Sequence, residues 1–440
     1  MKKVIYILIT TILIIGLTGC RFTEREPNYE SSDLEYLIYS KSEEKQNYLN
    51  SAEYLNFIKQ IGYFSTDLTE KVYNKYQENY DQFTISPLSI YMALAMGAAS
   101  ASPDGQIELS EMLGISYEDI LEYTKYLYSS LNQSYYDEYN KLMYMIQLSN
   151  SIWLNDSLDY KEQGVQTLRD AFYVDSYSVP FTTKNEEANK AVQDYVRRNT
   201  KGLIDNEYSF DGYTLFLLIN TLYLKDTWNS YGEKLRLTPK TYSFKNINGT
   251  TTDSKLLMGD YVSGKAKQAD GFEYFYTRTN HNLQLYFIKP TTKSLDVIFT
   301  KDNLTLVLED KNYNYINDEL KEEYYTRCLF PTFEASFKED LVDLLKDEYG
   351  ITSIFKRPSA NFNQITDEEC YTSELIHQTK LIVDEKGIEG AAVTIMANAG
   401  EAAPDPSYQK VFYDFIIDEG FGFMIVKNNT ILFSGAIKNI

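Results

Sequence analysis

One long segment near the C-terminus constrains the fold more than any other feature of the chain. It comprises residues 384–406 and connects two apolar stretches of strand-like composition, residues 381–383 and 411–417. Connections inside compact domains usually have about 4 to 6 residues, so this one is unusually long. Most loops are polar, whereas this one consists mainly of small residues and β-formers. The fold must therefore accommodate a long connection that has the composition of a strand.

At a period of two, this segment has one face that can be buried. That face carries Ile388, Gly390, Ala392, Thr394, Met396, Asn398 and Gly400. The opposite face carries Glu389 and Glu401, which can lie in solvent. We interpret Gly387 as a hinge at its start, because glycine tolerates unusual backbone conformations. Composition alone leaves two interpretations open, a flexible surface loop and a segment that can become a strand.

The rest of the chain has the composition of a large folded core and of few chemical functions. Hydrophobic residues make up 43% of the 440 residues, including 40 Tyr and 23 Phe, which argues against disorder. The net charge of -21 repels phosphate backbones, so we expect no nucleic-acid partner. Two His and three Cys leave little material for a metal site or a disulfide framework, and we interpret Cys328 and Cys370 as buried thiols. Common catalytic motifs are missing, so we predict no enzyme activity, no metal and no cofactor.

Helical patterns dominate the first half of the chain and strand patterns the second. Apolar residues spaced three or four apart predict helices over residues 51–72, 105–113, 117–131, 160–173 and 185–199, and a buried helix over 90–99. Strand patterns cover residues 147–154, 215–224, 241–247, 272–278, 283–289, 329–337, 375–384, 411–417, 421–427 and 430–437. No linker or repeat divides residues 51–440, so we predict a single α+β domain.

The N-terminus resembles a secretion signal. Two lysines precede an apolar run of about 14 residues, which is shorter than the roughly 20 residues of a membrane-spanning helix. The following Leu17-Thr18-Gly19-Cys20 resembles a bacterial lipobox, in which Cys20 is lipidated. We predict a signal peptide over residues 1–19, the lipidated Cys20 with a polar tether over 20–50, and a folded domain over 51–440. The protein would then be anchored to the outer face of a bacterial membrane, although a plain secreted chain or an uncleaved anchor remains open.

Several motifs, in a characteristic order, resemble those of one family. These are Phe83 to Ile90, Ala188 to Val196 with Thr200 to Ile204, Leu218 to Trp228, Asp384 to Gly387, Glu389 to Thr394, Phe421 to Phe423, and Leu432 to Gly435. In this order and spacing they resemble the serpins, a family of serine protease inhibitors, over about residues 55–440. The resemblance implies the serpin fold, with a mainly helical N-terminal half, three β-sheets and an exposed reactive-centre loop over about residues 386–408.

The resemblance also implies a mechanism and the residues that carry it. In inhibitory serpins the target protease cleaves the loop and is trapped as an acyl-enzyme, because the loop inserts into the main sheet as a new strand. The matching hinge residues here are Glu385, Gly387, Ile388, Gly390, Ala391, Ala392 and Thr394. Ser86, Ser89, Asn220 and His377 match the hydrogen-bonded cluster where the sheet opens, and Trp228 matches the breach at the top of the sheet.

The family's spacing places the scissile bond at Glu401-Ala402, with Ala399-Gly400 and Ala402-Ala403 as alternatives. A glutamate at this position favours a glutamate-specific protease, and an alanine favours an elastase-like or subtilisin-like one. We expect the protein to be a monomer.

Five positions depart from the family pattern, and two of them, Gln82 and Gln193, stand where the family usually has Asn. Asp226 stands where the family usually has Gly, Ile388 where Thr, Ser or Val is commoner, and Thr332 where some members have a lysine that pairs with the hinge glutamate. Any ion pair of Glu385 must therefore involve another residue. A second hypothesis also stays open, a serpin-fold protein that binds at a surface without inhibiting.

Overall fold

The fold comes from a computed structural model, which describes residues 35–38, 49–228, 234–292, 294–310, 316–355, 361–390 and 408–440. The elements below belong to one compact unit that starts at Leu34. Cys20 and the predicted signal peptide lie outside the described residues. None of the helices in the described part of the chain is long and apolar enough to cross a membrane.

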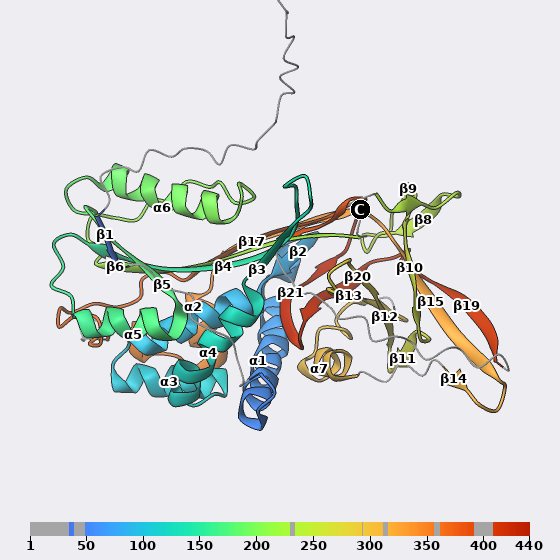
Figure 1. The fold of residues 1–440 in the computed structure, drawn as a ribbon, viewed down its shortest axis with the longest axis horizontal. Helices are drawn as coiled ribbons and strands as arrows, with labels where there is room; N and C mark the ends of the chain where they lie inside the picture. Colours follow the sequence, from blue (N-terminus) through green and yellow to red (C-terminus); the bar gives the residue numbers. More distant parts are fainter. Residues whose placement is uncertain are drawn as a thin grey trace, which may run out of the picture. The chain divides into compact units, whose positions relative to one another are not determined.

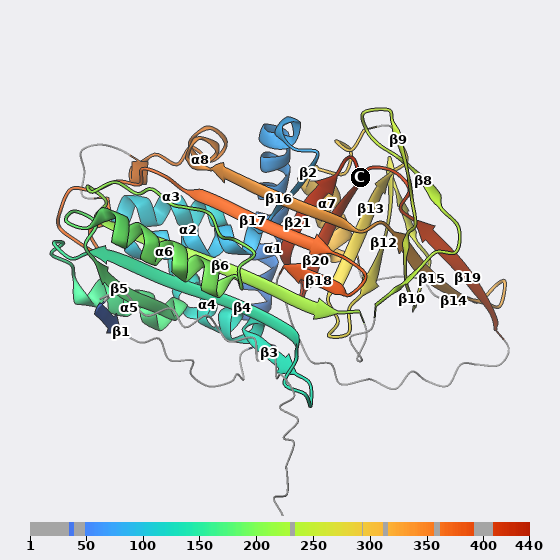
Figure 2. The same cartoon turned by 90° about the horizontal axis from the view of Figure 1, so that it is seen from above.

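The largest sheet has eight strands and contains the predicted hinge. Its order is β1-β5-β4-β6-β18-β17-β16, with β3 paired to β4 (Figures 1 and 2). The strands are β1 (Glu35–Ile38), β3 (Gln133–Tyr136), β4 (Leu142–Asn155), β5 (Val174–Val179), β6 (Phe216–Thr227), β16 (Phe333–Asp340), β17 (Ile376–Val383) and β18 (Gly387–Gly390). A four-residue strand, β1, within the segment predicted as a tether thus pairs with β5.

Two further main sheets and a small hairpin complete the β structure. The six-stranded sheet has the order β11-β12-β13-β20-β21-β2, and β15 pairs with β14, β10 and β19 in the five-stranded sheet, where β10 also pairs with β7. The strands are β2 (Gln82–Ile85), β7 (Arg236–Leu237), β10 (Leu257–Ser263), β11 (Lys267–Ala269), β12 (Phe272–Arg278), β13 (Gln284–Pro290), β14 (Ile316–Asn317), β15 (Glu322–Phe330), β19 (Gln409–Ile416), β20 (Phe421–Lys427) and β21 (Thr430–Ile437), with the hairpin formed by β8 (Tyr242–Lys245) and β9 (Thr251–Ser254).

Helices cover both faces of the eight-stranded sheet. The helices in the described part of the chain are α1 (Ala52–Tyr76), α2 (Pro87–Ser100), α3 (Pro103–Leu113), α4 (Tyr117–Leu131), α5 (Glu162–Phe172), α6 (Asn185–Asn199), α7 (Lys301–Glu309) and α8 (Val342–Tyr349). α6 lies across one face, and α2 and α5 lie on the other (Figure 1). Ser86 precedes α2, and its hydroxyl accepts a hydrogen bond from the N–H of Ser89, which caps the helix. Pro87 suits the first helical turn, because a backbone N–H at that position would have no acceptor within the helix.

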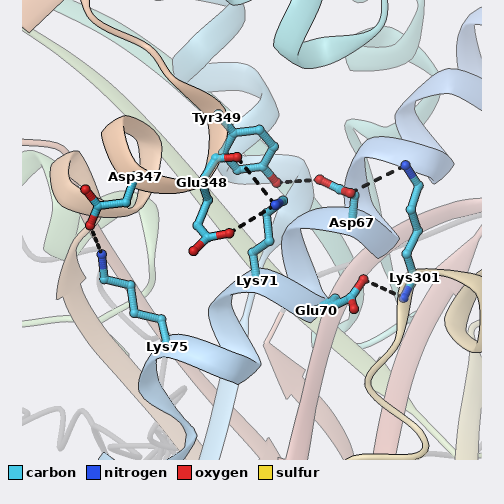
Figure 3. Close-up of polar contacts among 8 residues, drawn as sticks. All are labelled: Asp67, Glu70, Lys71, Lys75, Lys301, Asp347, Glu348 and Tyr349. Carbon is cyan, nitrogen blue, oxygen red and sulfur yellow. Dashed lines mark hydrogen bonds and ion pairs between the residues drawn. The ribbon is translucent and has the colours of Figure 1, made fainter.

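Polar contacts attach α8, which follows β16, to the long helix α1 (Figure 3). Lys71 pairs with Glu348 at 3.2 Å, and the hydroxyl of Tyr349 donates to Asp67 at 2.8 Å. Asp67 also pairs with Lys301, 3.4 Å away at the start of α7. Exposed ion pairs contribute little individually, about 0 to 1 kcal/mol each, but these contacts act together. They link the edge of the sheet that contains β16 and β17 to α1.

The predicted fold class is confirmed, and most predicted elements are present. One element is wrong: the strand predicted over residues 329–337 is divided between β15 and β16, which are separated by Pro331 and Thr332. Proline has no N–H to donate to a strand ladder, so the pairing ends there. The loop predicted from about residue 386 begins later, because Gly387–Gly390 forms β18 inside the sheet.

Candidate functional site: the hinge and the slot beneath it

A tight reversal connects β17 to β18. The carboxylate of Asp384 accepts hydrogen bonds from the N–H groups of Lys386 and Gly387, at 2.7 and 3.2 Å. The N–H of Asp384 donates to the carbonyl of Gly387 at 3.0 Å, which closes the turn. Aspartate side chains stabilise turns in this way. The chain therefore turns back along β17 as soon as that strand ends.

β18 lies between two strands and pairs antiparallel with both (Figure 2). On one side Ile388 lies opposite Val383 of β17, and on the other side it lies opposite Asp226 of β6. Gly390 lies opposite Leu224. Residues 387–390 of the predicted hinge therefore already form a short central strand of the sheet.

The side chains of β18 alternate as the period-two pattern predicts. Ile388 is 1% exposed, whereas Glu389 is half-buried, accepts a hydrogen bond from the hydroxyl of Tyr223 at 2.7 Å and lies 3.7 Å from Lys225. Gly387 is required for a reason other than flexibility: a Cβ atom there would lie 2.0 Å from the carbonyl oxygen of Asp226. The absence of a side chain thus lets β18 approach β6.

Below β18, the sheet has an open slot between β6 and β17. β6 pairs with β18 only from Leu224 to Thr227, and β17 pairs with β18 only through Ile382 and Val383. Within the described ranges, residues 216–223 of β6 and 376–381 of β17 have no strand partner on the side of the slot. A cavity of about 780 Å³ lies there, lined by these strands, α2 and α6. Its walls include Leu218 and Thr379.

The four residues predicted to gate the sheet line this cavity together. The Nε2 atom of His377 accepts a hydrogen bond from the N–H of Ser86 at 3.1 Å, and Ser86 in turn caps α2 through Ser89. Burial lowers the pKa of His377 to about 3, so the ring is neutral and remains an acceptor. Asn220 donates to the side chain of Asn150 at 2.7 Å, whereas its buried Oδ1 has no partner among the described residues.

The predicted breach residue Trp228 contacts the turn directly. Its Nε1–H donates to the carbonyl of Asp384 at 2.7 Å, which connects the end of β6 to the reversal. The hinge glutamate Glu385 lies 3.9 Å from Lys234, and its carbonyl accepts from the N–H of Leu235. The ion pair of the hinge therefore involves Lys234, which sequence patterns did not indicate.

Several predicted site residues lie outside the described residues. Three of them belong to the hinge: Ala391, Ala392 and Thr394. All the candidates for the scissile bond also lie there, namely Ala399, Gly400, Glu401, Ala402 and Ala403, as does the predicted lipidation site Cys20. Neither of the two remaining cysteines forms a disulfide within the described ranges: Cys328 is buried and Cys370 half-buried. Burial raises the pKa of the Cys370 thiol to about 11 and that of Cys328 further, so neither is a reactive thiolate near neutral pH.

Comparison with known proteins identifies one family throughout. The family model described as serpin (serine protease inhibitor) matches residues 59–440. Iripin-1 of Ixodes ricinus is 28% identical over 378 residues, which cover 81% of this chain and 88% of the relative. Alpha-1-antiproteinase 2 of Equus caballus is 25% identical over 356 residues, covering 78% and 79%. The native state of tengpin, a thermophilic serpin of known structure, superposes with a TM-score of 0.70 at 21% identity, covering 92% of this chain and all of that one.

Proposed function

The chain belongs to the serpin family, and from this premise we propose that it is a suicide inhibitor of serine proteases. Members of the family are typically protease inhibitors and not enzymes. In the proposed mechanism the protease attacks the loop after β18 and forms an acyl-enzyme. The cleaved loop then fills the slot between β6 and β17 and carries the bound protease along the sheet before the acyl bond is hydrolysed.

The observation that carries this proposal is the arrangement of β18 above an empty slot. Adjacent strands lie about 4.8 Å apart, so β6 and β17 must be about 10 Å apart where β18 separates them. That spacing is already present at the top of the sheet, where both edges of β18 are paired. Further insertion extends existing ladders instead of nucleating new ones. The unpaired strand edges that border the slot provide hydrogen-bond partners for the incoming backbone.

The register of β18 indicates where the next residues would pair. Continued along both ladders, it brings Thr394 opposite Asn220 of β6 and His377 of β17. Directly opposite residues face the same side of a sheet, so the Thr394 side chain would enter the cavity. Its hydroxyl would meet the unpartnered Oδ1 of Asn220, an acceptor that is costly to leave unsatisfied when buried. This complementarity supports the gating role that sequence similarity assigns to Asn220 and His377.

The specificity and location of the inhibitor are further parts of the proposal. We place the scissile bond at Glu401-Ala402, with Ala399-Gly400 and Ala402-Ala403 as alternatives, and the target among glutamate-specific, elastase-like or subtilisin-like serine proteases. The absence of Arg and Lys from residues 387–409 disfavours trypsin-like targets. The lipobox-like sequence at Cys20 supports a lipid-anchored protein outside the cytoplasm of a bacterium.

The test is incubation of the chain from Arg21 onward with one protease of each class, followed by denaturing gels. A covalent band that survives SDS is expected with at least one protease other than the trypsin-like one. The mass of the released C-terminal peptide then identifies the scissile bond. Cleavage without such a band, and without a gain in thermal stability after cleavage, would instead support the alternative, a serpin-fold surface binding module that does not inhibit.

Two matched variants test insertion itself. Thr394→Arg places a charge on the face that enters the cavity, whereas Val393→Arg places the same charge on the opposite face. We expect Thr394→Arg to convert the protein into a substrate, with at least a tenfold loss of covalent complex. Val393→Arg should retain most of the complex. Equal effects of the two variants would contradict insertion in the register described above.

A further inference from the structure

A buried polar cluster lies at the upper end of β6, beside the hinge. The carboxylate of Asp226, a residue that is 1% exposed, accepts four hydrogen bonds. The donors are the N–H of Thr227 at 2.8 Å, the hydroxyl of Thr279 at 2.5 Å, the N–H of His281 at 3.2 Å and the Nδ1–H of His281 at 2.7 Å. All the donors except Thr227 come from the connection between β12 and β13.

The cluster extends into the six-stranded sheet. The carbonyl of His281 accepts from Nζ of Lys427, which lies at the end of β20 and is 2% exposed. The ring of His281 stacks on Tyr144 of β4 with a centroid distance of 4.1 Å. A backbone hydrogen bond from Asn280 to the carbonyl of Thr227 reinforces the connection. Asp226 and His281 thus join the top of β6 to a second sheet.

The same part of β6 borders the space that β18 occupies. Asp226 lies opposite Ile388 on one side and opposite Tyr144 on the other. Its carbonyl oxygen is the atom that Gly387 approaches too closely for any side chain. Any shift of Asp226 toward β17 would therefore close the space that β18 occupies.

The cluster can stabilise the fold only against the desolvation penalty of its buried charged groups. Burial raises the pKa of Asp226, with His281 opposing the shift, and lowers the pKa of Lys427 to about 8, with Asp226 opposing it. Each charge is therefore held against a desolvation penalty. Apolar side chains often stabilise such positions equally well, whereas hydrogen-bonded polar groups restrict geometry more tightly. A role in positioning therefore accounts better for these residues than a role in overall stability.

We propose that Asp226 and His281 are positioning residues that hold the end of β6 away from β17 and so keep β18 seated in the uncleaved protein. The inference rests on the proposed function only in treating this seated hinge as the starting point of insertion. We call the hydrogen-bonded pair of Asp226 and His281 the lock. Without it, β6 can relax toward β17 and expel Gly387–Gly390, which should slow insertion and increase the fraction of inhibitor consumed as a substrate.

Hydrogen exchange on the full, uncleaved chain in detergent tests this without any protease. Asp226→Asn removes the charge and leaves an amide facing donors. His281→Phe is the milder variant, because it keeps a ring against Tyr144 and the backbone donor to Asp226 but removes Nδ1. Glu334→Gln is the matched control: it removes one carboxylate from the same sheet, where Glu334 pairs with Lys380 at an exposed site.

We expect the amides of residues 387–390 to exchange at least tenfold faster in both cluster variants, with no change in Glu334→Gln or in the amides of β21. Unchanged protection of the hinge in folded His281→Phe would overturn the inference. Uniformly faster exchange across the sheet would also overturn it, because that pattern indicates a merely structural role. If Asp226→Asn does not fold, His281→Phe decides alone.

The two proposals fail in distinguishable ways. Absence of a covalent complex with the unmodified protein counts against inhibition, whatever the exchange data show. Unchanged hinge exchange in the variants counts against the lock, even where the unmodified protein inhibits. Where both hold, His281→Phe should raise the number of inhibitor molecules consumed per protease at least twofold relative to Glu334→Gln.

Discussion

The imidazole of His377 joins strand β17 to the start of helix α2: its Nε2 atom accepts the backbone N–H of Ser86 at 3.1 Å. His377 belongs to β17, whereas Ser86 caps α2 on the buried side of the sheet. The bond requires a neutral ring, because a protonated imidazole has no lone pair to offer. The protonation state of this ring should therefore influence how firmly β17 is held against the start of α2.

Acid should destabilise the folded protein through His377. Burial lowers its pKa from 6.5 in the unfolded chain to about 3, so the folded state binds fewer protons between these values. The stabilisation is complete above about pH 6.5 and decreases progressively as the pH falls toward 3. We expect His377→Gln, which can still accept from Ser86, to lose less stability than the unmodified protein between pH 7.5 and 5. Urea unfolding at both pH values measures the difference, and parallel losses in the two proteins would contradict this assignment.

Trp228 provides a second test at the opposite end of the slot. Trp228→Phe keeps an aromatic ring but removes the donor to the carbonyl of Asp384, leaving a partly buried acceptor unsatisfied. We expect a loss of about 1 to 3 kcal/mol in the free energy of unfolding, measured with urea. Hydrogen exchange at Lys386 and Gly387 should also increase. Trp153→Phe is the control, since Trp153 packs with Tyr177 and Tyr195 in a separate cluster. A loss of stability in Trp153→Phe but not in Trp228→Phe would mean that the hydrogen bond from Trp228 to Asp384 does not stabilise the turn.

Sequence patterns predicted the long regular elements because their periodicity is strong. α4 and α6 occur at 117–131 and 185–199 as predicted, with apolar residues on one face. The short elements were missed for a physical reason. α7 and α8 have 9 and 8 residues, too few turns for a clear period, and β5 has a mixed composition. Their conformation depends on tertiary contacts, such as those between α8 and α1.

The buried face of Gly387–Gly390 was predictable, but the contacts that support this strand were not. The alternation of small and charged residues indicated which face of β18 would be buried, and Ile388 is buried accordingly. In the sequence, Asp226 differs from its neighbours only in departing from the family pattern. Its partners Thr279 and His281 follow it by 53 and 55 residues, and Lys234 reaches Glu385 from another distant segment. Such pairings depend on the path of the chain in space, which local patterns do not encode.

Gly387 provides the sharpest test of the seated hinge. In Gly387→Ala the new Cβ would lie 2.0 Å from the carbonyl oxygen of Asp226, an overlap with backbone that no side-chain rotation relieves. β18 must therefore leave the sheet, and the amides of residues 388–390 should lose at least tenfold in protection from exchange. Gly212→Ala is the control, because its Cβ would lie 3.5 Å from the nearest atom, an ordinary contact. Insertion into the slot below would then start without a paired β18. Gly387→Ala should therefore also slow formation of the covalent complex, measured as the second-order rate of protease inhibition. Full protection of the hinge in this variant would mean that Gly387–Gly390 does not occupy the central position between β6 and β17.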